Sequence, residues 1–324
     1  MASEATKRYT RGIFRGLAAS RSGAEHPSYN PFMNAAPSSR TNQPLVGALA
    51  VTSSLISQNI GAAFAKSLFP IVGPAGMTFL RIGLAAILLV LIRRAWKAMP
   101  RQSVYRSLIV YGMALGVMNL LIYQAFARIP IGIAVAIEIL GPLTLVLLGA
   151  RRRWDFVWLA VAIAGLGLLL PLKENSTALD PVGVLCAIAA AVAWALYILA
   201  GKRISGVSGV DGVAWGIVVA AIITAPFGIA EAGAALASPN VLLLGLAVAA
   251  LSSAIPYSLE MAALRRMAAP LFSIVLSTAP AIAALAGFFV LDERLSASQW
   301  LAIVLIMCAA AGSTLAAYFR KGQA

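Results

Sequence analysis

Two side chains of opposite charge, Arg81 and Glu138, stand inside long apolar segments of this sequence. A carboxylate in the middle of a membrane costs on the order of 2.5 to 3.5 kcal/mol, so it needs a partner, a proton or an aqueous cavity. If both segments begin at the outer surface, both charges lie about 12 Å deep. They then form a structural ion pair, or they bind the carboxylate and the ammonium of a zwitterion such as an amino acid.

Proline interrupts two of the apolar segments at related places. Pro142 has no N–H group, so the carbonyl of Glu138, four residues earlier, lacks its helical partner. Pro280 leaves the carbonyl of Leu276 free in the same way. Paired helix breaks at matching positions indicate a central binding site of the kind found in transporters.

Other polar and aromatic side chains in the apolar segments are candidates for substrate binding, with packing or interfacial anchoring as their ordinary roles. Lys66 stands at the outer end of its segment, where it binds a substrate or snorkels to water. Glu260 is close to Arg265, and a snorkelling ion pair is the alternative there. The remaining candidates are Asn119, Tyr123, Trp194, Tyr197 and Tyr257.

The composition predicts an all-α polytopic membrane protein. Of the 324 residues, 61% are hydrophobic and 11% are charged, whereas soluble domains carry about 25% charged residues. Apolar runs long enough to cross a bilayer recur about ten times. They lie at 45–65, 73–95, 104–126, 130–150, 154–171, 181–201, 210–231, 240–264, 269–290 and 297–319.

An internal repeat divides the chain. The segment 128–149 aligns with 266–287, and an Arg, a Pro and the final Gly coincide at one offset. Halves with an odd number of spans enter the membrane from opposite sides, which predicts two inverted five-helix repeats. We place the repeats at 44–172 and 180–319, after a disordered basic cytosolic tail (1–43) and before a cytosolic C-terminus (320–324).

The positive charge sets the orientation. The 25 Lys and Arg residues divide into 20 on the N-terminal side, 4 on the other side and 1, Arg81, within the membrane. Because cytoplasmic loops collect basic residues, both termini are expected in the cytoplasm. The same rule explains the net charge of +14 without nucleic acid as a partner.

The sequence lacks the residues that several classes of protein function require. The only histidine, His26, lies in the tail, and Cys186 and Cys308 have no metal-ligand spacing, so we expect neither an enzyme nor a metal site or other cofactor. No Gly-rich ATP-binding motif with Lys is present. A sensor or scaffold remains an alternative. Its function would not change if the buried charged residues were replaced by apolar ones.

Several blocks of sequence resemble the threonine/homoserine exporters, which belong to the EamA-repeat branch of the drug/metabolite transporter superfamily. The blocks are 65–70 (AKSLFP), Arg81, 132–138 (GIAVAIE) with Gly141 and Pro142, 155–158 (DFVW) and 256–261 (PYSLEM). The resemblance covers about 45–319 and implies ten helices in two inverted repeats, a bacterial inner membrane and efflux of small neutral amino acids.

The resulting expectation is a secondary exporter of small amino acids such as threonine and homoserine, working by alternating access in the lipid bilayer as a monomer or homodimer. Arg81 or Lys66 would bind the substrate carboxylate, and Glu138 would bind the ammonium or carry a coupling proton. Export of aromatic amino acids, other metabolites or drugs by the same superfamily is the alternative.

Overall fold

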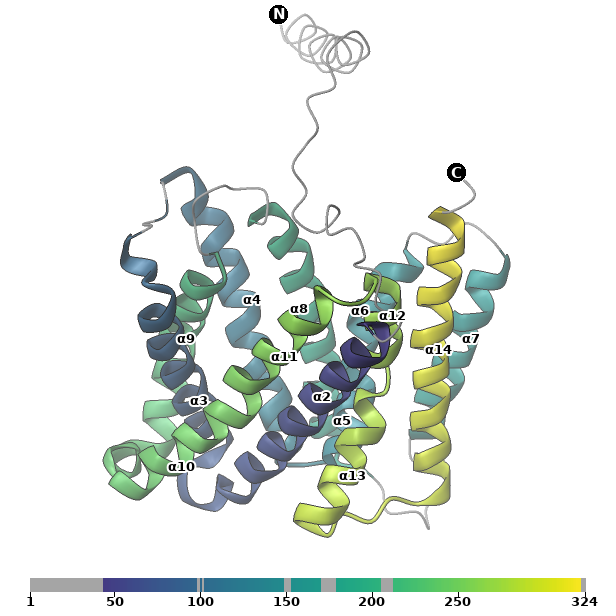
Figure 1. Ribbon diagram of the computed structural model, residues 1–324. Helices are drawn as coiled ribbons and strands as arrows, with labels where there is room; N and C mark the ends of the chain where they lie inside the picture. The colour runs from purple at the N-terminus through teal and green to yellow at the C-terminus, as the bar shows by residue number, and fades with distance from the viewer. Residues whose placement is uncertain are drawn as a thin grey trace, which may run out of the picture. The chain divides into compact units, whose positions relative to one another are not determined.

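The computed structural model describes residues 43–97, 100, 102–148, 153–169, 179–204 and 212–321. The predicted tail lies outside these residues except for Gln43, and the predicted C-terminal segment is described only through Lys321. Helices make up the regular structure of the described residues (Figure 1). In chain order they are α2 (Gln43–Ser67), α3 (Phe69–Arg93), η2 (Ala95–Lys97), α4 (Gln102–Phe126), α5 (Ile131–Glu138), α6 (Leu140–Leu147), α7 (Arg153–Leu169), α8 (Pro181–Ile204), α9 (Gly212–Ala232), η3 (Gly233–Ala237), α10 (Pro239–Ala249), η4 (Ala250–Ala254), α11 (Ile255–Leu264), α12 (Ala269–Leu276), α13 (Ala279–Leu291) and α14 (Ala297–Lys321).

The helices confirm the predicted membrane architecture. Among the described residues, 8 helices are long and apolar enough to cross a bilayer. Two shorter apolar helices, Ile131–Val146 and Phe156–Leu169, occupy the fourth and fifth predicted segments. The predicted all-α, multi-pass fold is therefore correct, although several of the predicted segments are made of more than one helix.

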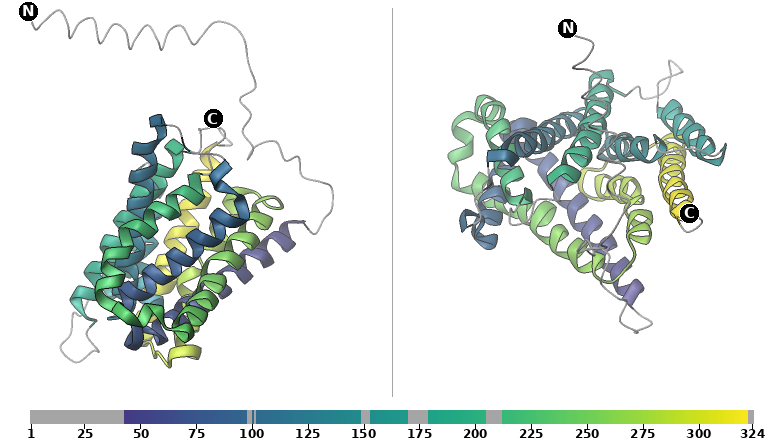
Figure 2. Two further views of the ribbon diagram at one scale, coloured as in Figure 1. Left: turned by 90° about the vertical axis from the view of Figure 1, so that its left-hand side faces the viewer. Right: turned by 90° about the horizontal axis from the view of Figure 1, so that it is seen from above.

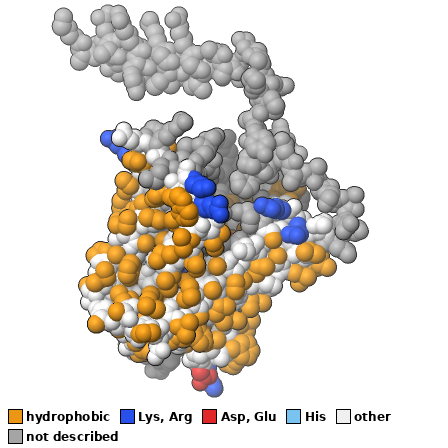
Figure 3. Space-filling model, turned by 60° about the vertical axis from the view of Figure 1, so that its left-hand side comes forward, with side chains coloured by type: hydrophobic (Ala, Val, Ile, Leu, Met, Phe, Trp, Pro, Cys, Tyr) orange, Lys and Arg blue, Asp and Glu red, His pale blue; other side chains and the backbone are white. Residues whose placement is uncertain are grey.

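Apolar side chains cover the sides of the helical body. Leu148 and Phe289 are each 77% exposed, and many other large apolar residues are also uncovered. Figure 3 shows this apolar surface as a broad band, with Lys and Arg side chains above it and a small charged group below. A soluble monomer rarely exposes so much apolar surface, so this band is the surface that faces lipid.

The helices pack in a symmetric pattern of pairs. Three helices pack against their counterpart in the other half of the chain: α3 on α9, α5 on α13 and α7 on α14. The contact of α2 with α11 is matched by that of α8 with α4. Figure 2 shows α7 and α14 side by side at one edge of the body. Two repeats related by a pseudo-two-fold axis would give this pattern.

Two helix breaks lie at the places that the prolines predict. The first is at Ile139, between α5 and α6, three residues before Pro142. The second is at Ser277 and Thr278, between α12 and α13, just before Pro280. A third break was not predicted: η4 is a π-helical segment that joins α10 to α11 two residues before Pro256. Single π-helical turns of this kind are frequent at functional sites.

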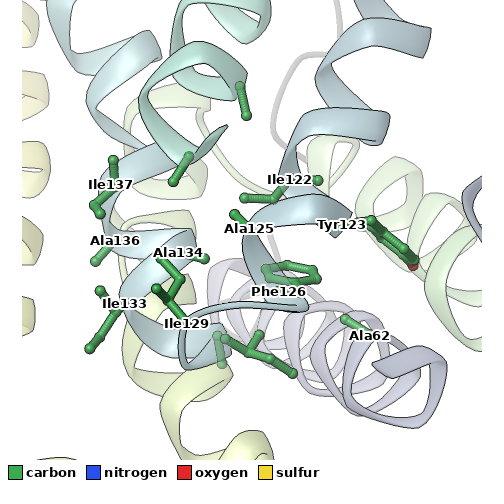
Figure 4. Packing of buried hydrophobic residues seen from close by; sticks show 14 of the residues in the cluster. Ala62, Ile122, Tyr123, Ala125, Phe126, Ile129, Ile133, Ala134, Ala136 and Ile137 are labelled. Carbon is green, nitrogen blue, oxygen red and sulfur yellow. The ribbon is translucent and has the colours of Figure 1, made fainter. Parts of the chain in front are cut away.

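The largest buried core joins α2, α4 and α5. Ala62, Ile122, Phe126, Ile133 and Ile137 belong to it, and Figure 4 shows their side chains. Tyr123 and Phe126 lie with their ring centroids 5.5 Å apart in the same cluster. This packing fixes α4 and α5, which carry Asn119, Tyr123 and Glu138.

The approach of α6 to α8 depends on Gly141. A Cβ atom at this position would fall on the backbone carbonyl oxygen of Ala191 in α8, which cannot move without shifting the helix. We expect Gly141→Ala to cost about 1–3 kcal/mol of stability, the usual range for overpacking. A lower melting temperature of the purified protein in detergent would show this.

Gly167 in α7 provides the matched control for Gly141. A Cβ atom there meets nothing within 4 Å. Since alanine has the higher helix propensity, Gly167→Ala should leave the melting temperature unchanged or raise it. Equal losses at the two positions would contradict the role assigned to the contact with Ala191.

Candidate functional site

A cavity of about 270 Å³ lies at the centre of the described helices, and we call it the central cavity. Helices from both halves of the chain form it, including the ends of α5 and α12 at the two predicted breaks. Seven of the predicted site residues line it: Arg81, Asn119, Tyr123, Glu138, Trp194, Tyr197 and Glu260.

Arg81 is held in place by residues of α4. Its Nη2 donates a hydrogen bond to the Oδ1 atom of Asn119, whose Nδ2 in turn donates to the carbonyl of Leu115 at 2.8 Å. The guanidinium carbon lies 5.0 Å from the ring centroid of Tyr123, within the range of a cation–π interaction. The backbone of α4 thus orients Asn119, and Asn119 orients Arg81.

Two donors in this cavity have no hydrogen-bond partner among the described residues. They are the Nε of Arg81 and the hydroxyl of Tyr123, and both atoms are buried. Leaving a buried donor unpaired costs about 1–3 kcal/mol, and more for a charged group. An acceptor that enters the cavity, such as a carboxylate, would remove this cost.

Glu138 borders the same cavity from the end of α5. Within the described part of the chain, neither Arg81 nor Glu138 has an ion pair within 4.0 Å. The two opposite charges are therefore brought to one small cavity without being locked to each other. Of the two alternatives that the sequence left open, this arrangement favours binding of a zwitterion over a structural ion pair.

Two aromatic side chains of α8 line the central cavity. Tyr197 stacks on Tyr111 of α4 with ring centroids 4.7 Å apart, and the Tyr111 hydroxyl lies 3.0 Å from that of Tyr197. Trp194, one turn earlier on α8, also lines the cavity. The side chain of Tyr257, another predicted site residue, lies outside the described part of the structure.

Glu260 has a different partner from the one considered for it. Its Oε1 lies 2.9 Å from the hydroxyl of Ser54 in α2, and it has no ion pair with Arg265 among the described residues. The local ion pair expected from spacing is thus not present, because the carboxylate points inward, toward α2.

A second, larger cavity of about 840 Å³ adjoins the first, and we call it the entrance chamber. Tyr197 and Glu260 line both cavities, so the two spaces meet at these side chains. The chamber is otherwise mainly apolar, with Leu88 and Leu89 on one wall, and Arg265 and Arg266 also line it. These two side chains therefore separate the chamber from the central cavity.

Lys66 does not line the central cavity. Its ammonium lies 2.7 Å from Glu293 Oε1 and donates to the carbonyl of Ile129 at 3.1 Å. The other oxygen of Glu293 accepts a hydrogen bond from the N–H group of Ile131 at 2.9 Å. These contacts, which we call the Lys66 clamp, tie the end of α2 to the start of α5 and to the segment after α13.

Sequence reasoning missed several polar residues near the site. Gln58 and Asn59 of α2 line the central cavity, and Ser54 contacts Glu260 from the same helix. The available signal was the polar run at 53–59, SSLISQN, inside an apolar segment. Glu293 had no comparable signal, since it lies among charged residues at a helix end, where charge is ordinary.

Comparisons with known proteins agree with this fold. A model of the EamA-like transporter family matches residues 181–315. The threonine/homoserine exporter RhtA of Salmonella typhimurium (strain LT2) is 43% identical over 272 residues, covering 84% of this chain and 91% of the relative. RhtA of Escherichia coli (strain K12) is 44% identical over 255 residues, covering 79% of this chain and 86% of the relative.

A solved crystal structure shares the fold, with a TM-score of 0.55 and 23% identity over 87% of this chain and 100% of the solved chain. The two curated relatives carry more weight, because identities of 43% and 44% extend over most of both chains. This protein therefore belongs to the threonine/homoserine exporter family within the EamA-like transporters.

Proposed function

We propose that this protein exports threonine, homoserine and similar small neutral amino acids across a bacterial inner membrane. Its curated relatives are named as threonine/homoserine exporters. The observation that carries the proposal is the central cavity itself, where a cation with a free donor and a carboxylate meet without pairing.

The substrate is bound by its two charged groups. Its carboxylate accepts hydrogen bonds from Arg81 Nε and the Tyr123 hydroxyl, the two buried donors that lack partners. Its ammonium faces Glu138, which borders the same cavity. Each charged group of the substrate thus exchanges its hydration water for a protein group that complements its charge. A metabolite without charged groups would not make these contacts.

The size of the cavity favours a small substrate. Its volume of about 270 Å³ is below the range of about 300–1,000 Å³ typical of sites for drug-sized ligands. Aromatic amino acids or drugs, the rival substrates, would have to extend past Tyr197 and Glu260 into the entrance chamber.

Transport proceeds by alternating access between two inverted repeats, 44–172 and 180–319. With both termini in the cytoplasm, the basic end that bears Arg265 and Arg266 is cytoplasmic, and the entrance chamber opens toward it. The Lys66 clamp then closes the outer side. The described conformation corresponds to the state that takes up substrate from the cytoplasm.

Counterflow in proteoliposomes tests the proposal. Vesicles containing the purified protein are loaded with unlabelled threonine, and the entry of labelled threonine is followed. We expect exchange that unlabelled homoserine inhibits and that phenylalanine or a cationic dye inhibits weakly. Exchange of phenylalanine or dye in preference to threonine would establish the rival, and exchange of none of them would remove the transport proposal.

A further inference from the structure

The hydroxyl of Ser54 has two acceptor oxygens as neighbours, one on Glu260 and one on Pro256. The hydroxyl oxygen of Ser54 lies 2.9 Å from Oε1 of Glu260 and 3.3 Å from the backbone carbonyl of Pro256. A serine hydroxyl has one hydrogen to donate. An ionised carboxylate and a carbonyl are both acceptors, so the hydroxyl can donate a full hydrogen bond to only one of them.

A proton on Glu260 allows both contacts of Ser54 to be full hydrogen bonds. The protonated carboxyl donates to the Ser54 oxygen, and the Ser54 hydroxyl donates to the carbonyl of Pro256. Both distances are then hydrogen bonds in one chain, with a donor and an acceptor at each step. Ser54 is fully buried, so its hydroxyl does not contact bulk water.

The surroundings of Glu260 supply no counter-ion for its ionised form. The elements that pack most closely on α11 are α2, η4 and α12, and the only charged residue in them is Lys66, which the clamp holds. Tyr197 of α8 borders both cavities, as Glu260 does. The central cavity is also bordered by Arg81 and Glu138, and the chamber by Arg265 and Arg266. None of these residues forms an ion pair with Glu260. A carboxylate in an apolar segment without a counter-ion favours its protonated form. Glu138 differs from Glu260 because it interacts electrostatically with Arg81 across the central cavity.

The position of Glu260 gives that proton a route. Glu260 is at the junction of the two cavities, so a proton leaving it enters the chamber on the cytoplasmic side. Loss of the proton leaves two carboxylates, Glu260 and Glu138, and one guanidinium, Arg81, around the central cavity. The resulting excess negative charge attracts the ammonium of the substrate.

We propose that Glu260, with Ser54, is the proton-binding site that couples export to an inward proton flow. This inference rests on the proposed export function and assigns the coupling role to Glu260, leaving Glu138 to bind the substrate ammonium. In the cycle, Glu260 releases its proton to the cytoplasm and substrate binds. After the outer side opens, substrate leaves and a proton from outside binds Glu260, so one proton enters for each zwitterion exported.

Infrared spectroscopy of the full chain in lipid nanodiscs tests the protonation without any substrate. Wild type is expected to show the carbonyl stretch of a protonated carboxylic acid at neutral pH. Glu260→Gln should lose this band, and Glu138→Gln should keep it. Loss of the band in Glu138→Gln alone, or its absence from wild type, would overturn the assignment.

Ser54→Ala provides a second test in case Glu260→Gln folds poorly. It retains the carboxyl group but removes its hydrogen-bond acceptor. The acid band should therefore persist at a higher frequency, since a weaker hydrogen bond stiffens the C=O bond. An unshifted band would show that the protonated acid is not the one beside Ser54.

Coupling is read from transport in proteoliposomes with and without a pH gradient. A pH gradient should stimulate threonine transport by wild type. It should also stimulate the transport that remains in Glu138→Gln. The exchange that remains in Glu260→Gln should not respond to the gradient. A retained response in Glu260→Gln, or stimulation of wild type by a sodium gradient alone, would overturn the coupling role. If wild type exchanges no threonine, the export proposal fails, and the infrared result still decides the state of Glu260.

Discussion

Replacing Arg81 with glutamine should reduce threonine binding on the order of a hundredfold or more and reduce counterflow to the background of empty vesicles. A hydrogen bond to a charged group contributes about 1.5–3 kcal/mol, and Arg81→Gln removes the one from Nε together with the positive charge that attracts the substrate carboxylate. Glutamine also leaves Glu138 as an uncompensated negative charge in the cavity, which repels the substrate carboxylate. Titration calorimetry on the purified protein measures the loss of affinity.

Arg128 is the matched control for Arg81. It is an arginine at a helix end, 3.6 Å from Asp180, with 37% of its side chain exposed. Because exposed ion pairs contribute little, Arg128→Gln should bind threonine as wild type does. Tyr123→Phe, which removes a single neutral donor, should have an intermediate effect. Unchanged affinity in Arg81→Gln, with a normal melting temperature, would remove Arg81 from the site.

The sequence predicted the location of Arg81 and Glu138 well because one physical rule governs both. A charge inside an apolar segment is expensive unless it faces a cavity or a partner, and helix length converts residue number into depth. The two side chains were therefore expected at one level, and the structure brings both to the central cavity. The helix breaks near Pro142 and Pro280 were predictable for an equally local reason, the missing N–H group of proline.

The partners of Lys66 and Glu260 could not be predicted in this way. Lys66 pairs with Glu293 and Glu260 with Ser54, which are separated by 227 and 206 residues along the chain. Such contacts depend on how the two halves pack, and no local pattern encodes this. Local spacing instead favoured Arg265 for Glu260, whereas the carboxylate contacts Ser54 of α2.

Breaking the Lys66 clamp should shift the protein away from the cytoplasm-open state on the order of tenfold or more. Lys66→Met leaves Glu293 with a single donor, the N–H group of Ile131, and without a counter-charge. The side chains of Lys66 and Glu293 are 21% and 12% exposed, so we expect a cost of about 1–3 kcal/mol, below the range for fully buried pairs. The lost contact destabilises the conformation whose outer side is closed. The population of the conformation that is open to the outside therefore rises.

Accessibility of the entrance chamber measures this shift. A cysteine introduced as Ser258→Cys lines the chamber, and Cys186 and Cys308 are first replaced by serine so that it is the only thiol. In inverted vesicles, a membrane-impermeant maleimide should label it more slowly, on the order of tenfold, when Lys66 is methionine. Labelling at the wild-type rate would show that the clamp does not hold the outer side closed.

Two further variants separate the clamp from a general effect of charge. Arg294 and Asp292 form an ion pair at the same end of the protein, with 80% and 78% of their side chains exposed, so Arg294→Gln should not change the labelling rate. Adding Glu293→Gln to Lys66→Met removes the uncompensated charge but keeps an oxygen for the N–H group of Ile131. The double variant should therefore label faster than Lys66→Met alone, because the unpaired carboxylate, rather than the missing ammonium, is what opposes closure.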